Sequence, residues 1–194
     1  MTAAPHHALP REVRIIGGQW KRSKLPVPDA HGLRPTPDRV RETLFNWLGQ
    51  NLSGWRCLDA FAGSGALGFE AASRGADAVV LLERDHRLAA GLNESRQRLN
   101  AAQVRVETAD AMAWMARCPA DAFELVFIDP PFDAALVEPA VALARRLVVP
   151  QGLVYVEAGQ ALKGDWLDAR GLGLHRQGRA GAVHFHLLQR VGFV

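Results

Sequence analysis

The sequence predicts an α/β protein: a doubly wound, mostly parallel sheet that ends in an antiparallel hairpin and carries a small N-terminal hairpin-and-helix extension. Three observations support this prediction. From residue 55, short apolar runs alternate with stretches of helical periodicity, which is the rhythm of repeated βα units. Near the end of the chain, two strand-like runs flank a Gly-Arg-Ala-Gly turn at residues 178–181. The chain before residue 55 is basic and is punctuated by prolines.

The extension is expected to begin with a strand at residues 12–16, which two glycines end, and residues 19–27 are expected to pair back on it. A loop marked by four prolines follows: Pro26, Pro28, Pro35 and Pro37. Thr36 as a hydroxyl N-cap, with Pro37 at the first helical position, predicts a helix that runs to about Gly49.

Each short apolar run after residue 55 predicts a buried strand, and each longer periodic stretch predicts a crossover helix. In chain order, strands are expected at 56–61, 78–83, 104–107, 124–129 and 152–157, and helices at 65–74, 86–100, 110–117 and 134–147. The terminal hairpin pairs 172–177 with 182–190. The chain therefore divides into a disordered tail (1–10), a basic extension (11–54) and one domain (55–194).

The charge of the chain is unevenly placed. Residues 1–56 hold nine Lys or Arg and four acidic residues, a net charge of +5, whereas the remaining 14 basic and 16 acidic residues give −2. A basic segment on a nearly neutral domain indicates either a polyanion-binding appendage or a solubilising surface, and charge alone does not separate the two.

Several classes of protein are excluded by simple features. No apolar run reaches the length of a membrane span, and the N-terminus lacks the pattern of a secretory signal. The two cysteines, Cys57 and Cys118, have no metal-type spacing. His184 and His186 lie two apart on an expected strand, but no third ligand is evident. The sequence thus predicts a cytoplasmic protein without a metal site.

The first candidate site is the loop after the strand at 56–61. Asp59 lies near the end of this strand, and a turn of small residues leads into the next helix. Glycines let the backbone approach a ligand, and a helix N-terminus offers free N–H groups. Ligands of doubly wound sheets bind at this edge. We therefore expect cofactor contacts here from four residues: Asp59, Phe61, Gly63 and Gly65.

A dinucleotide cofactor is the competing interpretation of this loop. The stretch Gly63-Ser64-Gly65-Ala66-Leu67-Gly68 fits the pattern Gly-x-Gly-x-x-Gly. Asp59 favours a cofactor that carries an amino acid, because a carboxylate there suits its amine. Glu83 ends the next strand, with Arg84 beside it, and a carboxylate at that position can bind both hydroxyls of a ribose. That feature supports a nucleoside cofactor of either kind.

A rigid acidic turn follows the strand at 124–129. It reads Asp129-Pro130-Pro131-Phe132, and two prolines can continue neither a central strand nor a helix. The Asp129 side chain and the Pro130 carbonyl can then converge on one point. An exocyclic base amine needs two such acceptors, because its lone pair is delocalised into the ring. Phe132 offers a face for stacking the base. Asp129, Pro130 and Phe132 are therefore the predicted catalytic residues.

Together these motifs resemble those of class I S-adenosylmethionine-dependent amino-methyltransferases. The chain is similar to the bacterial 16S rRNA guanine-N2 methyltransferase family called RsmD. Two N-terminal segments carry the specific part of the likeness: Arg-Ile-Ile-Gly-Gly-Gln-Trp-Lys at 14–21 and the stretch 33–48. The resemblance spans roughly residues 12–158. Thr36-Pro37 stands where the family often has two threonines.

The resemblance implies a seven-stranded class I methyltransferase fold and S-adenosyl-L-methionine as cofactor. It implies methylation of a guanine 2-amino group in 16S rRNA, during assembly of the small ribosomal subunit, by a protein that is usually monomeric. It places Asp110 and Ala111 beside the adenine ring. Taken alone, Asp110 fits a helix cap better, but together with Asp59 and Glu83 the adenine role is favoured. The residues expected to bind RNA are Arg14, Lys21, Arg22, Lys24, Arg34 and Thr36.

Four other functions compete with this interpretation. A DNA or RNA adenine-N6 methyltransferase uses the same Asp-Pro-Pro-Phe logic, but such DNA enzymes commonly carry an added recognition domain. A protein glutamine methyltransferase usually has Asn in place of Asp129. A non-catalytic RNA-binding assembly factor is disfavoured by the intact Asp59, Glu83 and Asp129. A nicotinamide-dependent enzyme is the last alternative.

Overall fold

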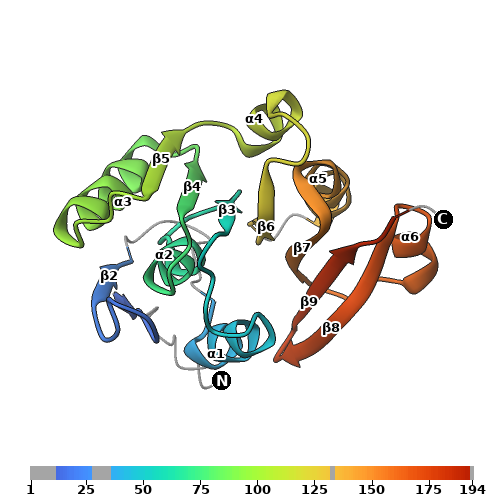
Figure 1. Cartoon of the computed structure of the whole chain (residues 1–194), viewed down its shortest axis with the longest axis horizontal. Coiled ribbons are helices and arrows are strands. Elements are labelled where there is room, and N and C mark those ends of the chain that lie inside the picture. Colours follow the sequence, from blue (N-terminus) through green and yellow to red (C-terminus); the bar gives the residue numbers. More distant parts are fainter. Residues whose placement is uncertain (1–11, 28–35, 132–133, 193–194) are drawn as a thin grey trace, which may run out of the picture.

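The computed structural model describes residues 12–27, 36–131 and 134–192, and its centre is a seven-stranded sheet (Figure 1). The strands are β3 (Arg56–Asp59), β4 (Ala78–Glu83), β5 (Val104–Thr108), β6 (Phe123–Ile128), β7 (Val148–Ala158), β8 (Leu172–Ala180) and β9 (Val183–Arg190). Their spatial order is β5-β4-β3-β6-β7-β9-β8. The first five are parallel, and β9 and β8 form the antiparallel hairpin at one edge. The predicted fold class is confirmed.

Helices cover both faces of the sheet. One face packs against α1 (Asp38–Trp47), α2 (Ala66–Ser73) and α3 (His86–Arg98), and the other against α4 (Ala111–Arg117), α5 (Ala134–Leu147) and α6 (Gly164–Asp168). Successive strand residues point to opposite faces, so Phe127 joins the first core layer and Ile128 joins the second. This double burial explains why the parallel strands read as continuous apolar runs.

The N-terminal extension packs into the first core layer. Its short antiparallel pair, β1 (Glu12–Arg14) and β2 (Lys24–Pro26), confirms the expected hairpin. Ile15 and Leu25 are fully buried in the same cluster as Phe69 of α2. Trp47 of α1 stacks on Phe185 of β9 with ring centroids 5.3 Å apart, as its place on the apolar helix face predicts.

The predicted start of α1 is wrong. The helix begins at Asp38 with Pro37 as its N-cap residue, and no side chain caps it. The Thr36 hydroxyl does not turn back to the helix, because it donates instead to Glu157 at the carboxyl end of β7, at 2.9 Å. Sequence propensity alone gives no sign of this distant partner.

Two stretches near the chain end also differ from the prediction. β7 begins at Val148, before the expected residue 152, and its pairing with β6 shifts register between Val148 and Leu153. Gln151 has a φ of 64°, which interrupts the alternation by which a strand is recognised. The sequence does not predict α6, because a five-residue helix is too short to show periodicity.

Candidate active site

The site lies at the carboxyl edge of the sheet, between β3 and β6. From β3 the chain winds outward to β4 and β5, whereas from β6 it winds the other way to β7, so these neighbours form the topological switch point. Ligands of open α/β sheets bind at that point. The strands bring Asp59, Glu83, Asp129 and Glu157 to this edge.

The loop after β3 has backbone conformations that favour glycine. Gly63 has a φ of 51° and Gly65 a φ of 76°. A Cβ at Gly65 would lie 2.7 Å from side-chain atoms of Phe69 and Leu92, so even a small side chain would force the core to shift. The Gly63 N–H donates to Glu83 Oε2 at 3.1 Å. The loop is therefore held in one shape by β4 and by the packing of α2.

Asp59 is a buried carboxyl that organises this loop. It is 2% exposed, and its Oδ2 accepts the Gly68 N–H at 3.0 Å. Burial raises the pKa of Asp59 to about 7, against the opposing effect of hydrogen bonds from the Gly68 and Phe61 amides. A positive charge arriving at this edge would favour the ionised form. The structural task of Asp59 is thus shown, and its expected contact with a cofactor stays a prediction.

The remaining residues expected to bind the cofactor lie around the same edge. Glu83 is half-buried, and its second oxygen accepts the Asp85 N–H at 2.9 Å. Phe61 is half-buried against the second core layer, and Ala111 is buried in it, whereas Arg84 is exposed. Asp110 caps α4, accepting the Ala113 N–H at 2.8 Å. Its expected role at an adenine ring stays a prediction beside this structural one.

Asp129 follows β6 directly and is half-buried beside Pro130. Its Oδ2 lies 3.4 Å from the Thr36 hydroxyl. Burial raises the pKa of Asp129 well above its ordinary value, and the nearby charges of Glu157 and Asp59 raise it further. A carboxylate with a raised pKa is a stronger base, which suits an acceptor of protons. Phe132, the third predicted catalytic residue, lies outside the described residues.

A second carboxyl, which the sequence does not predict, lies beside Asp129. Glu157 of β7 is 8% exposed, and its Oε1 accepts hydrogen bonds from the hydroxyls of Thr36 and Tyr155, each at 2.9 Å. Burial raises the pKa of Glu157, while the two hydroxyl donors oppose that shift. The available signal was a charged residue closing the apolar run Leu153-Val154-Tyr155-Val156, on the strand next to β6.

The structure separates the residues expected to bind RNA. Lys21 and Arg22 are exposed on the extension, and Arg14 and Lys24 are exposed but paired with Asp38 and Glu12, each at 2.7 Å. Thr36 is buried beside the two carboxyls and belongs to the site itself.

Arg34 lies outside the described residues. Trp20, on the same extension, is half-buried against the first core layer.

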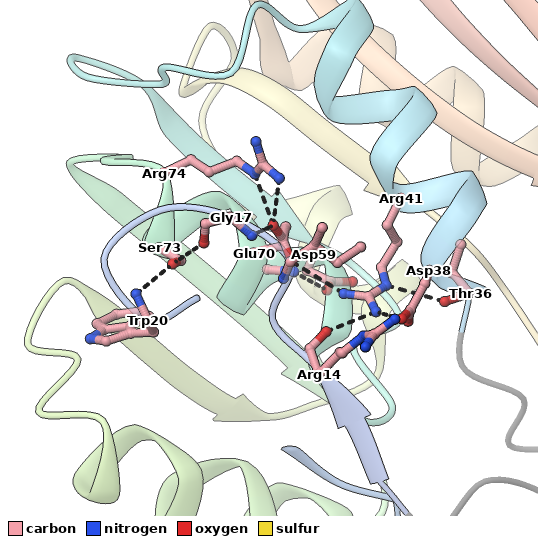
Figure 2. A network of polar contacts seen from close by, with 12 residues as sticks. Arg14, Gly17, Trp20, Thr36, Asp38, Arg41, Asp59, Glu70, Ser73 and Arg74 are labelled. Atoms are coloured by element: carbon pink, nitrogen blue, oxygen red, sulfur yellow. Dashed lines mark hydrogen bonds and ion pairs between the residues drawn. The ribbon is translucent and has the colours of Figure 1, made fainter. Parts of the chain in front are cut away.

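A buried ionic network joins the extension to the helix that follows the cofactor loop (Figure 2). Glu70 of α2 is fully buried and accepts hydrogen bonds from the Ile16 and Gly17 amides, both at 2.8 Å. Its carboxylate is flanked by Arg41 at 3.2 Å and Arg74 at 2.8 Å. Arg41, itself fully buried, also donates to the carbonyls of Arg14 and Thr36. The network therefore fixes the extension next to the site.

The described part of the chain has no group of three or more His, Cys, Asp or Glu side chains suited to a metal ion. Among the helices of the same ranges, none has the length and apolar character that crossing a membrane requires.

The chain is similar to a defined family of proteins. It matches the model described as conserved hypothetical protein 95 over residues 13–189. It is 43% identical, over 188 residues, to the ribosomal RNA small subunit methyltransferase D of Escherichia coli strain K12, covering 96% of this chain and 94% of that relative. The protein of the same name from Haemophilus influenzae is 45% identical over 151 residues, covering 75% and 78%.

Solved structures agree with this likeness. A putative methyltransferase from Escherichia coli superposes with a TM-score of 0.81 at 40% identity, covering 93% of this chain and 98% of that one. A putative methylase from Haemophilus influenzae gives 0.76 at 36% identity, covering 93% and 99%. A Burkholderia thailandensis 1,6-didemethyltoxoflavin-N1-methyltransferase, solved with S-adenosylhomocysteine, gives 0.63 at 12% identity, a likeness of fold alone, and covers 80% of this chain and 78% of that one.

Proposed function

Because the chain belongs to the ribosomal RNA small subunit methyltransferase D family, we propose that it transfers a methyl group from S-adenosyl-L-methionine to the 2-amino group of a guanine in 16S rRNA. One observation carries the proposal: Asp129 and Pro130 stand at the switch point, on the strand directly beside β3 and its cofactor loop. A target amine held by Asp129 would therefore lie next to a cofactor held by that loop.

The residues at the strand ends fit this cofactor, which supplies a methyl group on a sulfonium when it is bound. Asp59 provides negative charge for the ammonium of its amino-acid part. Glu83 accepts one amide N–H on each oxygen, so each oxygen keeps a lone pair for a ribose hydroxyl. Asp110 and Ala111 lie at the start of α4, after the neighbouring strand, and would border the adenine.

Asp129 and the Pro130 carbonyl would accept the N–H bonds of the exocyclic amine. Two acceptors favour the pyramidal amine and turn its lone pair toward the methyl carbon. As the new N–C bond forms, the S–CH₃ bond of the cofactor would break and S-adenosylhomocysteine would leave as a neutral thioether. The amine would acquire the positive charge, and one of its protons would pass to the Asp129 carboxylate. The raised pKa of Asp129 makes this transfer favourable, and the proton then leaves to solvent.

The rRNA would approach over the N-terminal extension. Lys21 and Arg22 are exposed there, on a segment that the Arg41–Glu70 network holds against α2. Cationic side chains on a fixed platform bind the phosphate backbone and orient it, whereas the carboxyl edge of the sheet selects the base. We propose that the protein acts in this way as a monomer on the assembling small subunit.

The substitution Asp129→Ala tests the proposal. Methyl transfer to small-subunit rRNA is expected to fall by a factor of about 100 or more, because Asp129 acts on the base. Affinity for S-adenosylhomocysteine, measured by calorimetry, should stay within a few-fold of the wild-type value. The control is Asp168→Ala, which removes an exposed carboxylate at the end of α6. Near-wild-type turnover of Asp129→Ala would contradict the proposed mechanism.

A further inference from the structure

Glu157 stands beside Asp129 by the register of the sheet. Ile128 of β6 pairs with Val156 of β7 in parallel register, so the residues that follow them leave the sheet next to each other. Neighbouring strands are about 4.8 Å apart, a spacing at which two side chains can contact one planar base. The Thr36 hydroxyl confirms this proximity, because it lies 2.9 Å from Glu157 Oε1 and 3.4 Å from Asp129 Oδ2.

The surroundings of Glu157 do not resemble those of a structural ion pair. A buried carboxylate is costly unless a cation or several donors compensate it. Glu70 meets that requirement with two arginines and two amides. Within the described ranges, Glu157 has two hydroxyl donors, both on Oε1, and no salt bridge to Lys or Arg. Within the same ranges, no group donates a hydrogen bond to Glu157 Oε2.

We propose that Glu157 is a specificity-determining residue whose Oε2 accepts the N1–H of the target guanine. This inference rests on the proposed function, since it concerns the same base. Guanine presents two neighbouring donors on this edge, the N1–H and the 2-amino group. If Asp129 and the Pro130 carbonyl accept the hydrogens of the 2-amino group, the Glu157 carboxylate is the acceptor left for N1–H. The hydroxyls of Thr36 and Tyr155 hold Oε1 and so fix the orientation of the carboxylate.

Adenine would be rejected by the same arrangement. Its amine is flanked by an unprotonated N1, whose lone pair would face a carboxylate oxygen. A site built around a donor discriminates strongly against an analogue that lacks it, because its own buried polar group is then left unpaired. The pair of carboxyls therefore accounts for selection of guanine over adenine, a choice that the Asp-Pro-Pro turn alone does not make.

The test compares two bases in two proteins. Small subunits would be reconstituted with rRNA carrying either guanine or 2-aminopurine at the methylated position; both have a 2-amino group, but only guanine has N1–H and the adjoining 6-oxo group. The change in preference between wild type and Glu157→Gln isolates the N1 contact, because the 6-oxo group differs equally in both comparisons. The wild-type protein is expected to prefer guanine in kcat/KM by about 100-fold or more. In Glu157→Gln, the amide can offer its NH₂ to the N1 lone pair, so the preference should shrink to within about 10-fold.

The outcomes separate this inference from the proposed function. If the wild-type protein methylates guanine and 2-aminopurine equally well, or if Glu157→Gln keeps the full preference, Glu157 does not read N1–H. If no N2-methylation of guanine occurs at all, the proposed function itself fails. Tyr155→Phe is the matched variant, because it removes one donor to Oε1 and leaves the carboxylate: it should retain most of the preference. Affinity for S-adenosylhomocysteine should match wild type in both variants, which checks their fold.

Discussion

Thr36 and Glu157 are 121 residues apart in the chain, yet a 2.9 Å hydrogen bond joins them. Thr36 precedes Pro37, the N-cap residue of α1, and Glu157 lies next to the last residue of β7, beside Asp129. The bond connects the N-terminal extension to the carboxyl end of β7, where the site lies. Under the proposed function, the extension would therefore orient the carboxyls that hold the target base, in addition to binding RNA.

Replacing Thr36 with Val tests this tie. The methyl group fills the place of the hydroxyl, so packing is kept while Glu157 loses a donor. We expect a loss of about 1–2 kcal/mol in unfolding free energy, from the unsatisfied buried acceptor. We also expect a fall in kcat with little change in cofactor affinity. Thr43→Val is the control, since the Thr43 hydroxyl bonds only to the Arg39 carbonyl of its own helix. Equal effects of the two variants on kcat would refute the orienting role.

The pH dependence of methyl transfer reports on the coupled carboxyls. Asp129 must be ionised to accept the amine proton, and burial together with Glu157 raises its pKa. The rate is therefore expected to fall as the pH drops through a value well above the ordinary aspartate pKa of about 3.9. Glu157→Gln removes the neighbouring charge, so the fall in rate on the acid side of the pH–rate profile should move to lower pH. If the rate falls at the same pH in wild type and variant, the two carboxyls do not interact.

Asp59 should make the protein less stable as the pH rises. Its pKa in the folded state is about 7, above the ordinary value of 3.8, so the folded state holds an extra proton between these two values. The unfolding free energy should therefore decrease across that window, and Asp59→Asn should abolish the decrease. Between pH 5 and 8 the difference amounts to roughly 2–3 kcal/mol. Urea unfolding at both pH values measures it, and Asp168→Asn should behave like wild type.

The same substitution at Asp59 should weaken cofactor binding. An asparagine retains the hydrogen bond to the Gly68 amide but supplies no charge for an ammonium group. We expect Asp59→Asn to have a higher unfolding free energy and a lower affinity for S-adenosylmethionine. A purely structural role for Asp59 would not produce these two effects together. If affinity is unchanged, Asp59 serves only to shape the loop.

The Arg41 network is expected to dominate the stability of the extension. Arg41→Ala leaves the buried Glu70 with one arginine fewer and frees two carbonyls, which should cost about 3–5 kcal/mol. Arg39→Ala, on an exposed position of the same helix, should change stability by less than about 0.5 kcal/mol. Thermal unfolding compares the two. A small effect of Arg41→Ala would mean that water or repacking replaces the network.

Much of this architecture could be read from the sequence. The βα rhythm located the strands that meet at the switch point. The small-residue loop and the Asp-Pro-Pro turn predicted residues that the structure brings to neighbouring strand ends. Glu157 and the role of Thr36 were not predicted, because both depend on contacts between distant segments. Arg41 and Glu70 likewise carry no local signal, since a charged residue on a helix is usually exposed. Within the site, the features that the sequence did not predict are buried polar groups paired across the fold.

The basic extension can be tested through salt. Replacing Arg14, Lys21, Arg22 and Lys24 by Ala should weaken RNA binding and flatten its dependence on salt concentration, because fewer counterions are released. Arg14 and Lys24 are ion-paired with acidic residues, so most of the change in slope is expected from Lys21 and Arg22. Replacing Arg105 and Arg117, which are exposed on other elements, provides the control. If the dependence of RNA affinity on salt concentration is unchanged, the basic residues of the extension form a solubilising surface and do not bind RNA.

The most direct test of the account identifies the methylated nucleoside. The purified protein would be incubated with methyl-labelled S-adenosylmethionine and with naked small-subunit rRNA, under-methylated small subunits or duplex DNA, and the digested products analysed by mass spectrometry. The account predicts N2-methylguanosine from the rRNA or the subunits and no product from DNA. N6-methyladenine, or no methylated product despite measured cofactor binding, would contradict it.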